Sequence, residues 1–470
     1  MFGRELWNRI IKLKRSDNAI VLLKKNYLIF FLVFILTSCA SSSERVLSSS
    51  PEVQTLIYAN LTEGGPSRKM VDEFNQTHKK VQIEVRDYYS EDRKNARQKL
   101  LAEIVAGRSP DIIDLGGSLV TSSTTLLPYQ QMAQGGYLEN LWPYIESDPE
   151  LGRKAVLEAP LEAAEIDGGL FIAFDSVLIN TLVGATSIVG DRNSWTISEL
   201  WNAFSLMPKG STVLDYHFDQ PTVFSYIFGM SLDSYVDLET GQCNFDSEDF
   251  RSNLEFIRNF PVKFNWTTAE AVNSEVTERL LNGQQMLVSE VFWRLRDIQF
   301  WDNIFGGRAT FIGYPTSNGS VGSSFYIRGY KLAMSSTCRN KEAAWEFLRE
   351  MFLPKYSKND KEDVDGSGVL SLPINRADYE LLKELDMSTS TKSTRSLFDG
   401  PEYKYRPATE EECQRYENFI NSIDKIELCD QEIFSIVQDA SNPYFAGDRS
   451  LDDTVCLIDN RVSLYLNERQ

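Results

Sequence analysis

Apolar and polar positions along residues 53–115 predict a parallel sheet with helices between its strands. The expected strands are residues 53–59, 81–85 and 111–115, and the expected helices are residues 67–77 and 95–106. In the second strand apolar and polar side chains alternate, and Gly107 is suited to end the second helix. This βαβαβ order implies right-handed crossovers and a doubly wound sheet.

Ligands of doubly wound sheets bind beyond the carboxyl ends of the strands. The loops at residues 61–65 and 116–121 follow the first and third expected strands. Both loops are therefore candidates for ligand contact.

Further elements continue this mixture of strands and helices to the end of the chain. The pattern predicts strands at residues 171–174, 285–291 and 325–334 and helices at residues 245–259, 272–282 and 340–352. Capping-box patterns, Thr196 with Glu199 and Thr409 with Glu412, predict two more helix starts and a largely helical tail. The polar stretches 355–368 and 388–406 are expected to be surface insertions.

The first 38 residues differ from the rest in charge. They carry +5, so the remainder of the chain carries −24 of the total of −19. Lys24 and Lys25 precede an apolar run at residues 27–36, which is too short for a bilayer span of about 20 residues. The segment is typical of a secretory signal.

Residues 36–39 read Leu-Thr-Ser-Cys and resemble a bacterial lipobox, after which a Ser-rich tether occupies residues 39–50. Processing would leave Cys39 as an N-terminus carrying a lipid, and two acyl chains give stable membrane anchoring. The alternative is an ordinary signal peptide with a chance cysteine. The first reading predicts a protein held at the outer face of the cell membrane.

Composition excludes several functional classes. The acidic balance argues against a nucleic-acid partner, which requires clustered Lys and Arg. The two histidines, His78 and His217, lack metal-ligand spacing, which disfavours His-based zinc or Ser-His-Asp chemistry. Residues 360–366 only partly match a calcium loop, because Lys361 stands where the first ligand is needed, so no metal or other cofactor is expected.

The remaining cysteines show no CxxC spacing and are odd in number. They are Cys243, Cys338, Cys413, Cys429 and Cys456. A bridge between Cys413 and Cys429 is one alternative, but mostly buried thiols are the favoured interpretation.

Several short segments occur together in an order that resembles one known family. They are residues 103–107 (EIVAG), 110–115 (PDIIDL), 169–171 (GLF), 195–200 (WTISEL), 245–250 (FDSEDF), 281–286 (LNGQQM), 313–315 (GYP), 340–347 (NKEAAWEF) and 372–373 (LP). Over residues 53–469 the chain resembles extracellular solute-binding proteins, family 1, the maltose-binding-protein-like lipoprotein receptors of bacterial ABC importers.

The resemblance implies two doubly wound α/β lobes joined by a hinge, the periplasmic-binding-protein type II fold. One lobe would comprise residues 51–173 and 328–354, and the other residues 174–327 and 355–470. The crossings would lie near residues 174–176 and 325–328. The implied protein is a monomeric, non-enzymatic receptor that closes on a carbohydrate and is then read by an ABC permease.

A sugar site needs aromatic platforms and side chains that hydrogen-bond to hydroxyl groups. The candidate ligand contacts are Thr62, Glu63, Gly117, Ser118, Asp175, Tyr226, Glu290, Phe292, Trp293, Tyr326 and Arg328. Phe292 and Trp293 follow a strand where family members place a cleft aromatic, and the alternative for them, as for Tyr226, is packing in the lobe core. For Glu63 the alternative is a solvated loop acid, and for Asp175 a structural hydrogen bond. Arg328 could hold a hydroxyl pair or a carboxylate.

Two other functions remain open from the sequence. Abundant carboxylates and aromatics would also suit a surface glycoside hydrolase, although no pair of acids stands out at strand ends. A sensory lipoprotein could use the same fold to report a ligand to a membrane partner.

Overall fold

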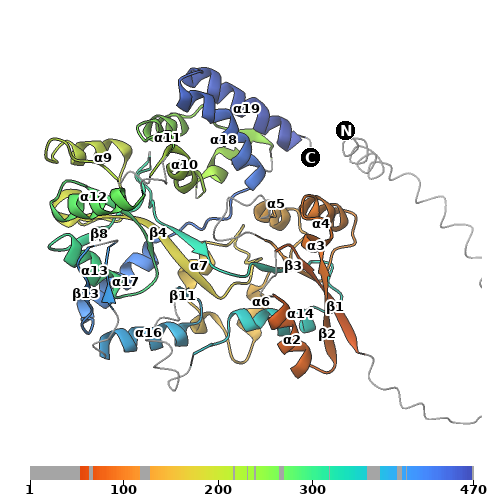
Figure 1. The fold of residues 1–470 in the computed structure, drawn as a ribbon. Coiled ribbons are helices and arrows are strands. Elements are labelled where there is room, and N and C mark those ends of the chain that lie inside the picture. The colour runs from red at the N-terminus through yellow and green to blue at the C-terminus, as the bar shows by residue number, and fades with distance from the viewer. Residues whose placement is uncertain are drawn as a thin grey trace, which may run out of the picture. The chain divides into compact units, whose positions relative to one another are not determined.

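The computed structural model describes most of the chain after the predicted tether. The described residues are 53–62, 67–116, 127–214, 218–229, 231–237, 240–263, 269–316, 318–356, 371–388, 394–397 and 400–467. Residues 53–470 form one compact unit, which contains two main sheets and their helices (Figure 1). The predicted signal, Cys39, Glu63, Gly117, Ser118 and the stretch at residues 360–366 lie outside the described residues.

The first sheet has the strand order β10-β3-β1-β2. Its strands are β1 (Gln54–Asn60), β2 (Val81–Asp87), β3 (Ile112–Asp114) and β10 (Leu332–Met334). Strand β1 runs parallel to β2 and to β3, whereas β10 is antiparallel to β3, with Leu332 opposite Asp114. The predicted βαβαβ arrangement is confirmed.

Helices lie on both faces of this sheet, as a doubly wound fold requires. They are α2 (Ser67–Thr77), α3 (Tyr88–Glu91), α4 (Ala96–Val105), α5 (Tyr129–Gln134), α6 (Trp142–Ser147) and α14 (Lys341–Leu348). Figure 1 shows α3, α4 and α5 on one side of the strands and α2, α6 and α14 on the other. The rings of Phe74 in α2 and Phe347 in α14 pack edge to face at 5.3 Å.

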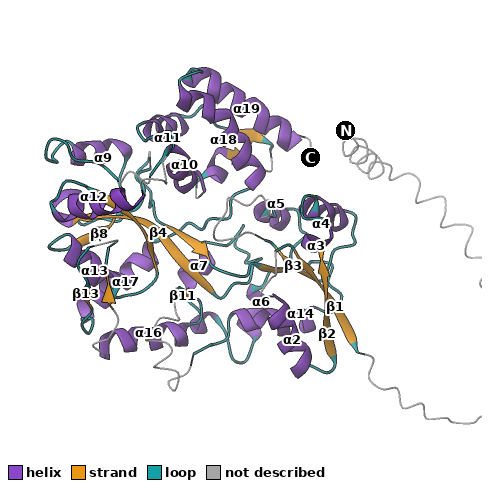
Figure 2. Cartoon of the chain, viewed as in Figure 1, coloured by secondary structure: helices purple, strands orange, loops and turns teal. Residues whose placement is uncertain are grey.

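The second sheet is built around the long strand β4 (Ser176–Ala185). Its other strands are β7 (Leu287–Phe292), β8 (Ala309–Phe311), β9 (Ser324–Ile327) and β11 (Leu372–Pro373). Each of the four pairs with β4 in the antiparallel sense. Strand β4 is buried from Val177 to Ala185, so this sheet, too, is covered by other elements (Figure 2).

The remaining elements are mostly helices. They are α7 (Glu158–Glu162), α8 (Thr186–Val189), α9 (Ile197–Phe204), α10 (Gln220–Gly229), α11 (Glu248–Arg258), α12 (Ala269–Leu281), α13 (Asp297–Ile304), α16 (Arg376–Ser388), α17 (Glu410–Ser422), α18 (Gln431–Ala446) and α19 (Leu451–Asn467). Three short 3-10 helices are η1 (Arg153–Ala155), η2 (Leu232–Tyr235) and η4 (Arg349–Met351), and the strand pairs β5 (Val236–Asp237) with β6 (Gln242–Cys243) and β12 (Thr394–Arg395) with β13 (Tyr403–Lys404) form two small hairpins. Both predicted capping boxes are present, at the starts of α9 and α17.

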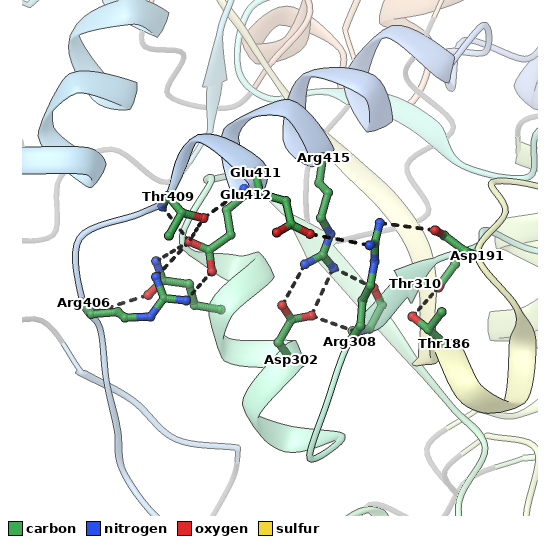
Figure 3. Close-up of polar contacts among 12 residues, drawn as sticks. Thr186, Asp191, Asp302, Arg308, Thr310, Arg406, Thr409, Glu411, Glu412 and Arg415 are labelled. Atoms are coloured by element: carbon green, nitrogen blue, oxygen red, sulfur yellow. Dashed lines mark hydrogen bonds and ion pairs between the residues drawn. The ribbon is translucent and has the colours of Figure 1, made fainter.

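Ion pairs connect α17 to residues in and beside the second sheet (Figure 3). Arg415 donates to both carboxylate oxygens of Asp302 at 2.8 and 3.1 Å and to the carbonyl oxygen of Ala309 at 2.8 Å. Arg308 lies between Asp191 at 3.3 Å and Glu411 at 3.6 Å. The helix is therefore held by its first turn and by its middle.

Two predicted strands differ from the structure. Residues 171–174 make only one bridge, between Ala173 and Leu332, because the chain here passes from one sheet to the other. The single strand expected at residues 325–334 is two strands, β9 and β10, each in a different sheet, separated by a bend at Gly329 with φ +96°.

The prediction that residues 388–406 are a surface insertion is wrong for part of this stretch. Leu397 and Tyr405 are buried, and the guanidinium of Arg395 pairs with Glu290 and Asp297. The physical reason is electrostatic, since two buried carboxylates need a cation nearby, and this polar segment supplies it.

All five cysteines of the described part are free thiols, and Cys338, Cys413 and Cys429 are buried. The prediction of mostly buried thiols is confirmed. None of the helices in the described ranges has the length and apolar character needed to cross a bilayer.

Candidate functional site at the junction of the two sheets

Polar side chains gather at the carboxyl ends of β1 and β3. Asp114, the last residue of β3, is 4 % exposed and accepts hydrogen bonds from the Gly116 backbone N–H at 2.9 Å and the Thr62 hydroxyl at 3.2 Å. Asn60 donates to Asp87 at 3.0 Å across the neighbouring strand end. Burial raises the pKa of Asp114 although these donors oppose the shift.

Lys331 places a positively charged side chain at the same edge of the first sheet. It directly precedes β10, and its carbonyl oxygen accepts from the Leu115 N–H at 2.8 Å, which fixes its position beside the end of β3. The side chain is buried, and its ammonium lies 5.6 Å from the centre of the Tyr326 ring. Burial lowers the pKa of Lys331 to about 8, against the opposing influence of the charges of Asp114 and Glu427.

Glu427 contributes the opposite charge from a position beside the second sheet. It lies between α17 and α18, where the Glu427 N–H donates to the carbonyl oxygen of Phe325 in β9 at 2.9 Å. Its Oε1 accepts from the amide of Asn180 at 2.5 Å and from the hydroxyl of Ser324 at 2.7 Å. Burial raises the pKa of Glu427.

These five residues, Thr62, Asp114, Tyr326, Lys331 and Glu427, are called the junction cluster below. Thr62, Tyr326 and Glu427 are partly exposed, whereas the other two members are buried. The cluster combines an ammonium donor, carboxylate acceptors, a hydroxyl and an aromatic face, which are the groups that recognise a polyol. In the described residues no group of His, Cys, Asp and Glu side chains is arranged to hold a metal ion.

Two predicted contacts, Thr62 and Tyr326, lie in the junction cluster, and two more lie near the crossings. The Arg328 N–H donates to the carbonyl oxygen of Ser176 at 3.2 Å. Asp175 accepts from the Ser176 hydroxyl at 3.0 Å and pairs with Lys355. Asp175 therefore makes the structural hydrogen bond that was its alternative interpretation.

Glu290, Phe292 and Trp293 belong to a different region, around Arg395. Glu290 is buried and accepts from Arg395 with both oxygens, at 2.9 and 3.0 Å, and Phe292 is fully buried against Phe311 and other rings. Trp293 is partly exposed, with its ring 5.9 Å from the guanidinium. Glu290 and Phe292 therefore make the contacts of residues in the protein interior.

Tyr226 lies in a third region, which is neither the junction cluster nor the surroundings of Arg395. Its neighbours Phe224 and Phe228 alternate with it in sequence, but the segment is the helix α10. The Tyr226 ring stacks on Tyr314 at 5.2 Å, and the hydroxyl of Tyr314 lies 2.8 Å from that of Ser289.

Sequence reasoning missed Lys331 and Glu427 and treated Asp114 only as part of a strand. For Asp114 the signal existed, since an acid at the carboxyl end of a parallel strand faces the usual ligand edge. Lys331 and Glu427 are far apart in the chain, and no local pattern marks either of them.

No protein-family model matches the sequence, and no curated protein does. Among solved structures, the sugar-binding protein MalE from Xanthomonas citri has 15% sequence identity and a TM-score of 0.52, and the match covers 88% of this chain and 98% of that one. An extracellular solute-binding protein family 1 from Alicyclobacillus acidocaldarius has 14% identity and a TM-score of 0.44 over 89% of this chain and 99% of that one. A putative oligosaccharide periplasmic-binding protein from Synechococcus has 15% identity and a TM-score of 0.46 over 88% and 99%.

The match to MalE covers most of both chains and agrees with the two helix-covered sheets described above. The predicted fold class is thus confirmed: the chain has the two-sheet α/β fold of the MalE-like solute-binding proteins, the periplasmic-binding-protein type II fold.

Proposed function

We propose that this protein is a non-enzymatic receptor at the outer face of the cell membrane that binds a carbohydrate, specifically an oligosaccharide, and delivers it to an ABC importer. The observation that carries the proposal is the composition of the junction cluster. Asp114 belongs to the first sheet, and Thr62 and Lys331 adjoin its strands, whereas Tyr326 belongs to the second sheet and Glu427 is hydrogen-bonded to strand β9 of that sheet. A ligand that contacts both groups stabilises the arrangement in which they are close, which is the basis of lobe closure.

The chemistry of the cluster and the fold support the same ligand class. A polyol hydroxyl both accepts and donates hydrogen bonds, so it is satisfied by an ammonium beside a carboxylate. The MalE of Xanthomonas citri, which shares this fold, is a sugar-binding protein. The lobe boundaries given above, with crossings near residues 174–176 and 325–328, belong to this proposal.

A thermal-shift screen over neutral mono- and oligosaccharides tests the function. We expect at least one sugar to raise the melting temperature further as its concentration increases and to be recovered unchanged, because only the folded protein binds it. Release of shorter sugars would instead favour a glycoside hydrolase and would refute the receptor.

The membrane anchor is a separate part of the proposal and rests on Cys39. Replacing it, Cys39→Ser, is expected to release the protein from the membrane fraction, whereas Cys456→Ser leaves it there. Equal distribution of the two variants would contradict lipidation of Cys39.

A further inference from the structure

Lys331 is a buried residue, 4 % exposed, and its ammonium makes no hydrogen bond in the described part of the chain. The interactions found there are the Tyr326 ring at 5.6 Å and the charges of Asp114 and Glu427, neither of which forms an ion pair with it within 4.0 Å. A buried charge is normally both paired and hydrogen-bonded, so this ammonium has three N–H donors available to another molecule.

Glu427 is complementary to Lys331. Both hydrogen bonds found to its carboxylate use Oε1, from Asn180 and Ser324, which leaves Oε2 as an acceptor without a partner among the described residues. The residue is partly exposed. The two groups are close enough for each charge to affect the pKa of the other, yet too far apart to pair directly.

The geometry points to a carbohydrate hydroxyl that bridges these two side chains, accepting a hydrogen bond from Lys331 Nζ and donating one to Glu427 Oε2. One hydroxyl would then connect the edge of the first sheet to the second sheet. This inference rests on the proposed function and assigns the residues that join the two halves of the site through the ligand.

The charges of the cluster also select the ligand. The groups that act on the Lys331 ammonium are the carboxylates of Asp114 and Glu427 and the ring of Tyr326. When both acids are ionised, two carboxylates beside one ammonium leave a net negative site, which repels an acidic sugar. We therefore expect neutral sugars to bind and uronic acids to be rejected.

The test uses calorimetric titration of the full mature chain with maltotriose, cellotriose and raffinose as neutral probes and trigalacturonate as the acidic probe. Lys331→Met removes the donors at similar length, and Glu427→Gln removes the charge while keeping an acceptor for Asn180 and Ser324. Lys341→Met is the matched control, because Lys341 already pairs with Glu139 at 2.7 Å.

Each of the two cluster variants is expected to weaken binding of the neutral probe by about tenfold or more, since a charged hydrogen bond is lost. The double variant should lose less than the product of the two single losses, because both act on one hydroxyl. The control should bind as the unaltered protein does. Unchanged affinity in the cluster variants, or additive losses, would overturn the bridge and leave the proposed function standing.

The pH dependence is a second readout that a purely structural lysine would not produce. Binding should weaken as the pH rises above about 8, where Lys331 loses its proton, and should be independent of pH in this range in Lys331→Met. If Lys331→Met does not fold, the pH dependence of binding by the unaltered protein and the affinity of Glu427→Gln still test the bridge. Preferred binding of trigalacturonate would overturn the charge argument, and a lack of binding by all neutral probes would refute both the receptor and the bridge.

Discussion

Arg395 lies between two buried carboxylates, and this arrangement determines how the interior around β7 responds to mutation and pH. Its guanidinium donates to Glu290 at 2.9 and 3.0 Å and to Asp297 at 2.7 Å. The side chains of the two acids are 7% and 2% exposed, so water screens neither charge. Removing the arginine would leave both acids unpaired in a medium that disfavours their ionised form.

We predict that Arg395→Met lowers the free energy of unfolding by about 3–5 kcal/mol at pH 8. Burial raises the pKa of Glu290 from 4.5 to about 7 even beside the arginine, so this carboxyl favours folding while it is protonated, and that contribution is lost as the pH rises through this interval. The loss caused by the mutation should therefore be smaller at pH 5, as denaturant unfolding at both values would show.

A suitable control is Arg153→Met, whose partner Glu146 lies at 2.7 Å in an exposed pair. This variant should cost less than about 1 kcal/mol and show little dependence on pH. Equal losses in the two variants would contradict the role assigned to burial.

At this scale the sequence predicted some site residues and not others. Thr62 follows a recognisable strand, so its place at the ligand edge could be read from local pattern. Lys331 and Glu427 are brought together only by tertiary packing, and Arg395 lies in a polar stretch that looks solvated. Burial of a single charged residue depends on distant partners, which periodicity does not reveal.

Helix α17 begins with a capping box that the sequence predicted and the structure contains. The Thr409 hydroxyl accepts from the Glu412 N–H at 3.2 Å, and the Glu412 carboxylate accepts from the Thr409 N–H at 2.8 Å (Figure 3). Arg406 also donates to Glu412 at 2.6 Å. The start of the helix is thus fixed by several bonds that share one carboxylate.

Thr409→Ala is expected to lower the free energy of unfolding by about 1 kcal/mol, because a backbone N–H loses its acceptor. Thr409→Ser, which keeps the hydroxyl, should restore most of it. Thr77→Ala, at the C-terminal end of helix α2, serves as the control and should change the denaturation midpoint little. An unaltered midpoint in Thr409→Ala would mean that Arg406 alone holds Glu412.

Elements with their own start and stop signals were predictable, and those defined by distant pairing were not. Helix α2 spans Ser67–Thr77, as its apolar spacing predicted. The apolar run at residues 171–174 resembles a strand equally well, yet it finds only one bridging partner. Whether such a run becomes a strand depends on whether a neighbouring strand lies beside it.

Asp430 connects helices that cover the first sheet to helices near the C-terminus. It accepts hydrogen bonds from Gln131 in α5 at 2.6 Å and from Tyr465 in α19 at 2.9 Å, and it lies 3.6 Å from Arg97 in α4. It also caps α18 by accepting from the Glu432 N–H at 2.8 Å. If the protein opens and closes as proposed above, these bonds exist only while the two proposed lobes are together.

Asp430→Asn should favour the open form, because asparagine still caps α18 but removes the charge opposite Arg97. We expect a larger radius of gyration by small-angle X-ray scattering without sugar, and contraction when sugar is added. Asp452→Asn, which alters an exposed pair with Arg251, is the control. An unchanged scattering curve in Asp430→Asn would show that these bonds do not hold the lobes together.

The order of strands in the first sheet has a consequence for biosynthesis. Strand β3 is completed early, but its partner β10 is translated only after most of the second sheet, since Leu332 pairs with Asp114. A nascent chain that lacks residues 332–334 leaves one edge of β3 unpaired, and contacts of such long sequence separation form slowly. The polypeptide should thus remain incompletely folded until late in translation, which is the condition that an export channel for unfolded chains requires.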